Sequence, residues 1–211
     1  MKTLVLLGAG GHGRVVADAA VMAGWRDVVF LDDGFGSRDT NGVWPIVGPL
    51  VKWREMAAQC DLFVSVGDNG TRLRLFKELA SAGVSLPRIV HPSAVISAHS
   101  SIEAGTVIMA GAILQAFAAI GAAGIVNTGA TVDHDCRLDN AVHLSPGAHL
   151  AGTVSVGERS WIGMGANVRQ GINIGADVMV AAGATVVNDV ADRTTVMGVP
   201  AAPSKRIGSN S

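Results

Sequence analysis

Aliphatic residues recur at every sixth position over the second half of the chain. From Val90 to Val186 the sixth position is aliphatic seventeen times in succession, without an insertion. Small side chains follow four residues later, as at Ala94, Ala112 and Ala130. The period fits neither an amphipathic helix, which repeats at about 3.6 residues, nor a simple strand, which repeats at about 2. It predicts a hexapeptide β-helix, in which each repeat lays one short strand on a face of a triangular prism.

The first part of the chain alternates apolar strands with helical patterns. Residues 3–7 and 28–31 predict strands, and a glycine turn and a helix over 14–23 lie between them, which is a βαβ start. The pattern then predicts a surface loop over 34–41, a strand near 46–47, a helix over 49–58, a strand over 62–66 and a helix over 72–82. The helical period stops at 86–89. We therefore predict an α/β domain over residues 1–88 and the β-helix, with a C-terminal tail, over 89–211.

Composition and charge exclude several classes of partner. The chain has 16 basic and 17 acidic residues and no basic block, so we expect neither nucleic acid nor an anionic membrane as a partner. No segment is apolar and long enough to predict insertion into a membrane. Cys60 and Cys136 stand far apart, which predicts neither a disulfide framework nor a zinc knuckle. We expect a cytoplasmic protein.

A glycine turn follows the first predicted strand. Gly8, Gly10 and Gly13 match the pattern G-x-G-x-x-G, and Asp32 and Asp33 follow about twenty residues later. Such a turn presents backbone N–H groups to phosphate, and a following carboxylate reaches a ribose hydroxyl. The α/β part holds only half of a full dinucleotide fold, and no hydride-transfer domain follows it. We therefore expect a phosphate and ribose site rather than NAD, with a purely structural tight turn as the alternative.

Polar residues cluster in the middle repeats around His134. This histidine is the third residue of its hexapeptide, two positions after the inward Val132, so it should stand near a strand end and be reachable from outside. One coil of eighteen residues further on lies Gly152, which places a bare backbone N–H beside the imidazole. A general base next to an oxyanion donor suits acyl transfer from a thioester to an amine. Asp135 and Asp133 are both candidates for holding the ring, and a solvated corner histidine is the alternative.

His143 lies nine residues from His134, which is half a coil of the predicted prism. The two side chains therefore cannot share a corner within one subunit. If both serve one site, that site lies between subunits. This spacing and the flat outer faces of a solenoid predict a homotrimer.

Several motifs occur together along the chain in a specific order. They are Gly8-Ala9-Gly10-Gly11-His12-Gly13, Phe30-Leu31-Asp32-Asp33, Val66-Gly67-Asp68-Asn69, Ile89-Val90-His91-Pro92-Ser93-Ala94, Asn127-Thr128-Gly129, Val132-Asp133-His134-Asp135-Cys136 and Gly198-Val199-Pro200-Ala201. In this order they resemble the bacterial nucleotide-sugar N-acetyltransferases of the bacillosamine and perosamine pathways, over nearly the whole chain. The related sialic acid O-acetyltransferases share the pattern.

The resemblance implies a half-Rossmann α/β domain followed by a left-handed parallel β-helix. It also implies a homotrimer that binds acetyl-CoA between neighbouring prisms and needs no metal. His134 matches the catalytic base, and Asp135 stands where the bacillosamine enzyme has a glutamate, one methylene longer. The other matches are Asn127 near the reacting amine, His143, Met164 and Ala182 along acetyl-CoA, where Ala182 replaces a glycine of the family, and Gly10, Gly11, His12, Asp32, Asp33 and Gly67 at the nucleotide sugar.

The expected activity is acetylation of the 4-amino group of a nucleotide-linked 4-amino-4,6-dideoxy sugar. The best match is UDP-4-amino-4,6-dideoxy-N-acetylglucosamine, and GDP-perosamine and a sialic-acid-type O-acetyl acceptor are alternatives. A γ-carbonic-anhydrase-like zinc enzyme would need three convergent histidines, and His134, His143 and His149 lack the spacing of that family. A non-catalytic trimeric scaffold leaves the residues around His134 without a role.

Overall fold

The N-terminal domain is built on a three-stranded parallel sheet. The computed structural model describes residues 2–204 and orders this sheet β2 (Val28–Leu31), β1 (Leu4–Leu7) and β5 (Asp61–Val64). All four residues of β1 are buried, as expected for a central parallel strand covered on both faces. The remaining elements are α1 (Gly11–Met22), the hairpin strands β3 (Thr40–Asn41) and β4 (Trp44–Pro45), the short η1 (Leu50–Lys52) and α2 (Trp53–Met56), and α3 (Asn69–Ser81).

The predicted strands lie close to those observed, but several helix boundaries were wrong. Helix α1 begins at Gly11, three residues before the predicted start, because the glycine turn itself forms its first turn. Helix α3 begins at Asn69 because the Asp68 carboxylate caps it and accepts a hydrogen bond from the Thr71 amide at 2.7 Å. The predicted helix over 49–58 is reduced to η1 and α2. The predicted surface loop over 34–41 ends in β3, which pairs with β4.

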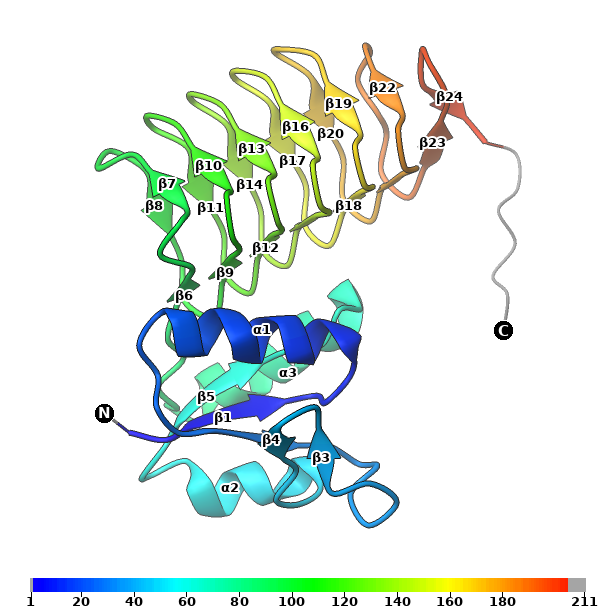
Figure 1. Cartoon of the computed structure of the whole chain (residues 1–211). Coiled ribbons are helices and arrows are strands. Elements are labelled where there is room, and N and C mark those ends of the chain that lie inside the picture. Colours follow the sequence, from blue (N-terminus) through cyan, green and yellow to red (C-terminus); the bar gives the residue numbers. More distant parts are fainter. Residues whose placement is uncertain (1, 205–211) are drawn as a thin grey trace.

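The second domain is a parallel β-helix with three faces, as the six-residue period predicts (Figure 1). Its left-handed winding is the one that the family resemblance implies. Face A contains β6 (Ile89–Val90), β9 (Val107–Ile108), β12 (Ile125–Val126), β15 (His143–Leu144), β18 (Trp161–Ile162), β21 (Met179–Val180), β23 (Thr195–Met197) and β24 (Ala202–Pro203). Face B contains β7 (Val95–Ile96), β10 (Ile113–Leu114), β13 (Thr131–Val132), β16 (His149–Leu150), β19 (Asn167–Val168) and β22 (Thr185–Val186). Face C contains β8 (Ser101–Ile102), β11 (Ala119–Ile120), β14 (Arg137–Leu138), β17 (Ser155–Val156) and β20 (Asn173–Ile174).

As far as β22, successive coils stack in a register of eighteen residues, and the last coil is shorter, since Met179 of β21 pairs with Thr195 of β23. Leu114 pairs with Val132, and Val132 pairs with Leu150, in a parallel ladder. The second residue of most strands points inward and is buried, so the aliphatic positions of the hexapeptide form one continuous core. The small residues before the strands, such as Ala112 and Ala130, are fully buried.

The three corners of the prism use different residues for the same left-handed backbone. The corner between faces A and B carries glycine in five successive coils, at Gly111, Gly129, Gly147, Gly165 and Gly183. The B–C corner carries Phe117, Asp135 and Thr153 at φ of 58° to 63°. Since non-glycine residues adopt this region only at an energetic cost, the stacked coils must impose the turn on them.

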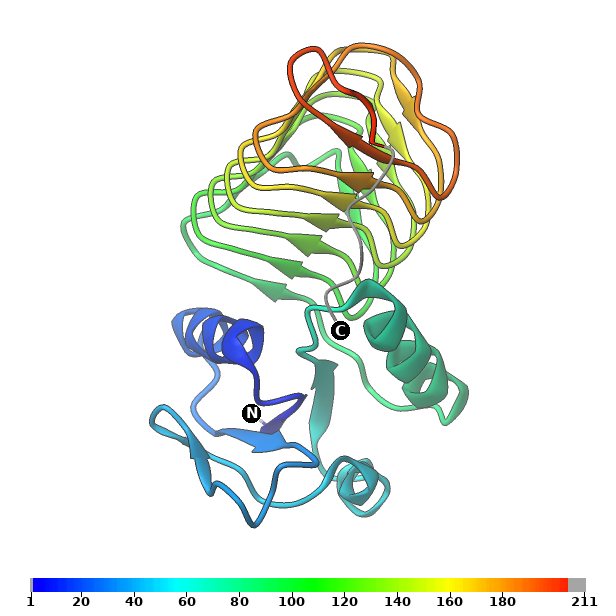
Figure 2. The same ribbon diagram turned by 90° about the vertical axis from the view of Figure 1, so that its right-hand side faces the viewer.

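The N-terminal domain lies against face A, and the B–C corner forms the opposite edge of the prism (Figures 1 and 2). Val16 and Ala20 of α1 share a buried apolar cluster with the outward residues Val107 and Ile125 of face A. The prism begins at β6, next to the predicted boundary at residue 88. The division into domains over 1–88 and 89–211 stays a prediction, and residues 205–211 of the expected tail lie outside the described residues.

The continuous core predicts that deleting a single inward side chain destabilises the whole prism. Leu114 is 1% exposed, so Leu114→Ala should lower the free energy of unfolding by about 2–5 kcal/mol. The control Val43→Ala, at a side chain that is 86% exposed, should change it by less than about 0.5 kcal/mol. Urea unfolding at one fixed protein concentration measures both. Equal changes in the free energy of unfolding for the two variants would contradict a tightly packed core along the axis of the prism.

Candidate active site

His134 stands at the B–C corner, where the turn after β13 leaves its imidazole exposed. Its side chain is 57% exposed, as the sequence predicts for a residue reachable from outside. The Asp135 Oδ2 atom lies 2.9 Å from His134 Nδ1. This hydrogen bond, with a smaller contribution from the charge of Asp133, raises the pKa of His134 above 6.5. The ring is therefore held with Nδ1 on the carboxylate and Nε2 free for another partner.

The two flanking aspartates have different contacts. Asp133 Oδ1 accepts a hydrogen bond from the His134 backbone amide at 2.7 Å and so fixes the turn. Asp135 contacts the ring itself. The geometry therefore distinguishes the two candidates that the sequence left open, and favours Asp135 as the residue that orients the imidazole.

Gly152 lies directly beside the His134 ring, one coil further along the prism. A Cβ atom added at Gly152 would contact Nε2 and lie 2.6 Å from Cε1 of the imidazole, so any larger residue would displace the ring. Among residues 2–204, no backbone or side-chain acceptor bonds the Gly152 amide. The predicted position of Gly152 beside the His134 ring is thus present in the fold, and the role of its N–H group stays a prediction.

Cys136 is fully buried two residues after His134. Its thiol donates a hydrogen bond to the Ala151 carbonyl at 3.1 Å, and burial raises the pKa of the thiol. The thiol is therefore not available as a nucleophile in this site.

A second group of candidate residues lies on face A, against the N-terminal domain. His143 is 6% exposed, and its ring stacks on Trp161 with centroids 4.8 Å apart. Asn127 Nδ2 lies 3.3 Å from His143 Nε2, and the His12 ring centroid lies 6.0 Å from that of His143. Asn127 therefore accompanies His143 within one chain, not His134.

The two buried histidines are held in the neutral form. Burial, with the nearby charge of Arg72, lowers the pKa of His12 to about 4 and that of His143 to about 3. His12 Nε2 and His143 Nδ1 are both buried and have no hydrogen-bond partner among residues 2–204. Because buried polar groups are normally paired, these two nitrogen atoms are suited to a bound polar group.

The glycine turn contains two kinds of glycine. Gly8 and Gly13 are required by the fold, because an added Cβ would lie 2.7 Å from Val66 Cγ2 and 3.1 Å from Phe30 Cε1, respectively. Gly10 and Gly11 face open space. No side chain caps the start of α1, and its first turn has no acidic residue. The free amide groups there suit an anion such as phosphate.

Asp32 and Asp33 bond within the N-terminal domain. Asp32 accepts hydrogen bonds from the amides of Ala9 at 2.7 Å and Gly34 at 2.9 Å, and pairs with Arg38 at 3.0 Å. Burial opposes ionisation of Asp32, but these bonds outweigh it and lower the pKa of the carboxyl group. Asp33 accepts from the Leu50 amide at 3.0 Å. Asp32 thus ties the glycine turn to the loop after β2, in addition to its predicted contact with a nucleotide.

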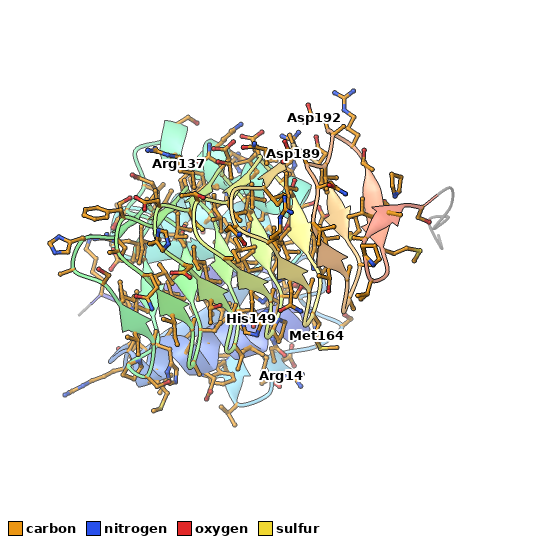
Figure 3. All side chains as sticks on the ribbon, turned by 90° about the horizontal axis from the view of Figure 1, so that it is seen from above. Arg14, Arg137, His149, Met164, Asp189 and Asp192 are labelled. Atoms are coloured by element: carbon orange, nitrogen blue, oxygen red, sulfur yellow. The ribbon has the colours of Figure 1, made fainter. Side chains whose placement is uncertain are left out.

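Met164 and Ala182 occupy adjacent coils of the A–B corner. The Gly183 amide donates to the Met164 carbonyl at 2.8 Å, and both residues are exposed. When the prism is viewed from above, Met164 and Arg14 lie along one side, and Arg137 and Asp189 on the side of face C lie along the other (Figure 3). This corner therefore adjoins face A and its histidines.

The candidate residues thus form two separate groups in one chain. His134, Asp135 and Gly152 lie together at the B–C corner. His12, Gly10, Gly11, Gly67, Asn127 and His143 lie on the side of face A, with Met164 and Ala182 at its edge. In a triangular prism face A and the B–C corner are opposite each other, so the two groups lie on different sides of one chain.

Comparisons with known proteins give this division a context. Residues 3–79 match the model of the PglD N-terminal domain. A UDP-N-acetylbacillosamine N-acetyltransferase of Bacillus subtilis strain 168 is 40% identical over 109 residues, and this match spans about half of each chain.

Solved structures match over nearly the full length. The acetyltransferase domain of PglB from Neisseria gonorrhoeae FA1090, solved with acetyl coenzyme A, is 42% identical over 96% of this chain and 99% of its own, with a TM-score of 0.93. A variant of perosamine N-acetyltransferase from Caulobacter crescentus, solved with CoA and GDP-perosamine, is 40% identical over 98% of each chain, with a TM-score of 0.91.

The chain belongs to the bacillosamine and perosamine type of nucleotide-sugar N-acetyltransferases. The predicted fold class and family are confirmed. The roles of the individual residues in this family member stay predictions.

Sequence reasoning missed two residues at the family's substrate side. Asn41 is 1% exposed, donates to the Gly10 carbonyl at 3.1 Å and accepts from Arg14 Nε at 3.1 Å, so it supports the glycine turn from the expected surface loop. Trp161 stacks on His143. Its signal was present, since the eighteen-residue register places it one coil after His143.

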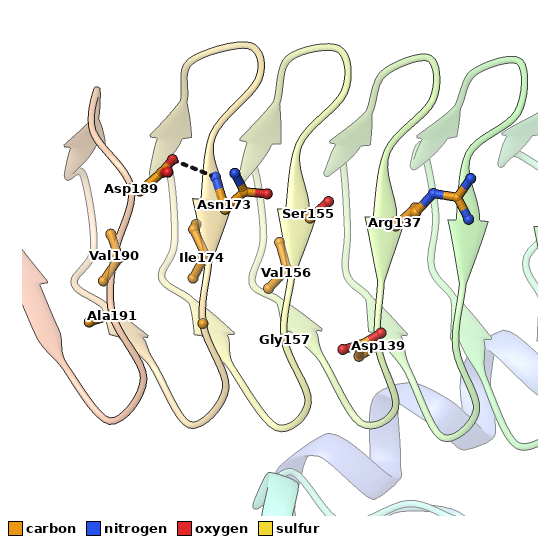
Figure 4. A pocket seen from close by; sticks show the side chains of 11 residues that line it. Arg137, Asp139, Ser155, Val156, Gly157, Asn173, Ile174, Asp189, Val190 and Ala191 are labelled. Carbon is orange, nitrogen blue, oxygen red and sulfur yellow. Dashed lines mark hydrogen bonds between the residues drawn. The ribbon is translucent and has the colours of Figure 1, made fainter.

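One groove on the prism lies apart from both groups of candidate residues. A groove of about 590 Å³ runs over face C and is lined by residues such as Arg137, Asn173 and Asp189, where Asp189 Oδ1 accepts from the Asn173 amide (Figure 4). It contains none of the predicted site residues. Between residues 2 and 204, no cluster of three His, Cys, Asp or Glu side chains is arranged to hold a metal ion, and no helix is long and apolar enough to cross a membrane.

The contact between Asp135 and the imidazole predicts the titration of His134. Replacing the carboxylate by an amide removes the main group that stabilises the imidazolium, so Asp135→Asn should lower the pKa of His134. Asp133→Asn should lower it less. Proton NMR titration of the imidazole measures both pKa values. A larger decrease in Asp133→Asn than in Asp135→Asn would show that Asp133, not Asp135, is the main partner of the ring.

Proposed function

We propose that this protein transfers the acetyl group of acetyl-CoA to the 4-amino group of a nucleotide-linked 4-amino-4,6-dideoxy sugar. The observation that carries the proposal is the imidazole of His134, bonded to Asp135 on one side and facing Gly152 on the other. The named activity of the Bacillus relative and the acetyl coenzyme A bound by the Neisseria domain support it.

The proposed reaction is a direct attack of the amine on the thioester. The sugar nitrogen forms a bond to the acetyl carbon while His134 Nε2 accepts the proton that the nitrogen loses. The Gly152 N–H stabilises the oxyanion of the tetrahedral intermediate. The carbon–sulfur bond then breaks, and CoA leaves as its thiol after taking a proton from the imidazolium. The exposed position of His134 lets both substrates approach without an acetylated enzyme.

We further propose that a complete site forms between neighbouring chains of a homotrimer. The opposite placement of the two groups of candidate residues supports this arrangement. One chain would contribute His134, Asp135 and Gly152. Its neighbour would contribute the glycine turn, His12 of α1 and His143 of face A, and acetyl-CoA would lie between the prisms along Met164 and Ala182.

In this proposal the nucleotide binds to the N-terminal domain. Gly10 and Gly11 approach the diphosphate, His12 and Gly67 face the sugar, and Asp32 or Asp33 reaches the ribose or base. A UDP-linked bacillosamine precursor is the preferred acceptor. The GDP-perosamine bound by the Caulobacter relative makes a guanosine sugar the second candidate. A cytoplasmic location is also part of the proposal and rests on the two separated cysteines, as in reducing compartments.

The proposed base gives a specific kinetic expectation. His134→Ala should lower kcat by about 10²-fold or more, because a positioned base typically contributes about 10² to 10⁴ in rate. Both KM values should stay within a few-fold, and Asp135→Asn should lower kcat less than His134→Ala does. Thiol release from acetyl-CoA in the presence of the amino sugar measures these rates. Near-normal kcat in His134→Ala would refute the role of the base.

The shared site predicts complementation between two inactive variants. Gly11→Asp adds a carboxylate that faces open space, so it should repel a diphosphate without disturbing the fold. Trimers that mix Gly11→Asp with His134→Ala chains should regain activity, because one of their three interfaces, about a third, combines an intact base with an intact glycine turn.

The experiment uses co-expression with two different affinity tags and purification over both. The two homotrimers, purified in the same way, are the controls. If the mixed trimers are no more active than the two homotrimers, the whole site lies within one chain.

A further inference from the structure

Arg72 in α3 is the largest fully buried side chain of the protein, at 1% exposure. All five N–H groups of its guanidinium form hydrogen bonds. Nε donates to the Ala123 carbonyl (2.8 Å), Nη1 to the carbonyls of Val66 (3.1 Å) and Gly67 (2.8 Å), and Nη2 to the Ala141 carbonyl (2.8 Å) and Asn69 Oδ1 (2.7 Å). None of the ion pairs formed within residues 2–204 includes Arg72.

These acceptors belong to two different parts of the molecule. Ala123 and Ala141 form the C–A corner of two successive coils of the prism, in the left-handed conformation. Val66 and Gly67 belong to the loop between β5 and α3. One planar group therefore bridges the prism and this loop. Asn69 extends the bridge, because its Nδ2 donates to the Arg159 carbonyl of the next coil at 2.8 Å.

The bridged loop contacts the predicted substrate residues. An added Cβ at Gly67 would lie 3.8 Å from the Cβ of His12, so the loop and the glycine turn are in van der Waals range. His12 in turn lies beside His143 of face A. A change in the position of residues 66–68 would therefore alter the place of Gly67 and His12 relative to the prism.

The charge of Arg72 reaches the same region. Burial lowers the pKa of the guanidinium to about 10, so it stays protonated at neutral pH. Its charge contributes to the low pKa of both His12 and His143. A buried cation surrounded by carbonyl groups gives the region around His12 and His143 a positive potential, which favours an anionic diphosphate.

We propose that Arg72 is a positioning residue for the nucleotide sugar, because it fixes the loop over residues 66–68, and through it Gly67 and His12, at a set distance from face A. This inference rests on the proposed function. It adds a residue that touches no substrate and that neither the motifs nor the spacing of the sequence single out.

The test replaces Arg72 and compares the two substrates. Lysine keeps the charge but has three donors on a flexible stem and cannot reproduce the planar fork. Arg72→Lys should raise KM for the nucleotide sugar by about tenfold, and Arg72→Met by more, since hydrogen bonds to charged groups contribute about a factor of ten or more each. KM for acetyl-CoA should stay within about threefold. The control Arg74→Met changes an exposed arginine on the same helix and should leave both KM values unchanged.

A merely structural role predicts a different result. It would lower the fraction of active protein and the melting temperature, and the two KM values would either stay unchanged or change by the same factor. Either of these two results for the KM values of Arg72→Lys would overturn the inference. If Arg72→Met fails to fold, Asn69→Ala supplies the second variant. It keeps the guanidinium but removes the link to Arg159, and should raise KM for the nucleotide sugar alone by a smaller factor.

Calorimetry with UDP and GDP separates this inference from the proposed function. Wild-type protein that binds neither nucleotide contradicts the proposed function. Hydrogen–deuterium exchange tests independently whether Arg72 holds the loop against the prism. Exchange of the amides of residues 66–71 should be faster in Arg72→Lys than in Arg74→Met. Unchanged exchange there would overturn the positioning role.

Discussion

The eighteen-residue register of the coils is the constraint on which the rest of the structure depends. Each parallel ladder fixes a residue beside its counterpart one coil away, so the inward aliphatic residues form a single core. The same register places Gly152 against the His134 ring and Trp161 against His143. The fold thus positions two groups of polar side chains on backbone that the core holds rigidly, as a precise site requires.

Some outward-facing side chains of the prism pack against the N-terminal domain, and others are candidate site residues. Face A begins with Ile89, Val107 and Ile125, which bury α1, and continues with His143 and Trp161, which lie where the start of α1 meets the prism. The B–C corner on the opposite edge carries His134 and Asp135. Because the N-terminal domain covers only one side of the prism, the proposed site pairs a nucleotide bound to that domain with the imidazole of a neighbouring chain.

The parts of the fold that follow from a fixed period could be predicted from the sequence. The strands of the prism, the burial of Cys136 and the contact of His134 with Gly152 all follow from counting residues. Contacts that depend on how irregular segments meet could not be predicted. Examples are the bonds of Asp32 to Ala9 and Gly34, the burial of Asn41 under the glycine turn, and the five carbonyl and amide acceptors of Arg72. In most of these contacts the partner is a backbone N–H or C=O group, whose direction no residue type reveals.

The most direct test of the account is to identify the product formed from acetyl-CoA and an amino sugar. The protein is incubated with UDP- and GDP-linked 4-amino-4,6-dideoxy sugars, and the products are examined by mass spectrometry and NMR. The account predicts that one of these sugars gains a single acetyl group on its 4-amino nitrogen, with one CoA thiol released for each acetyl transferred. An acetyl group on a hydroxyl, or thiol release without an acetylated sugar, would contradict it.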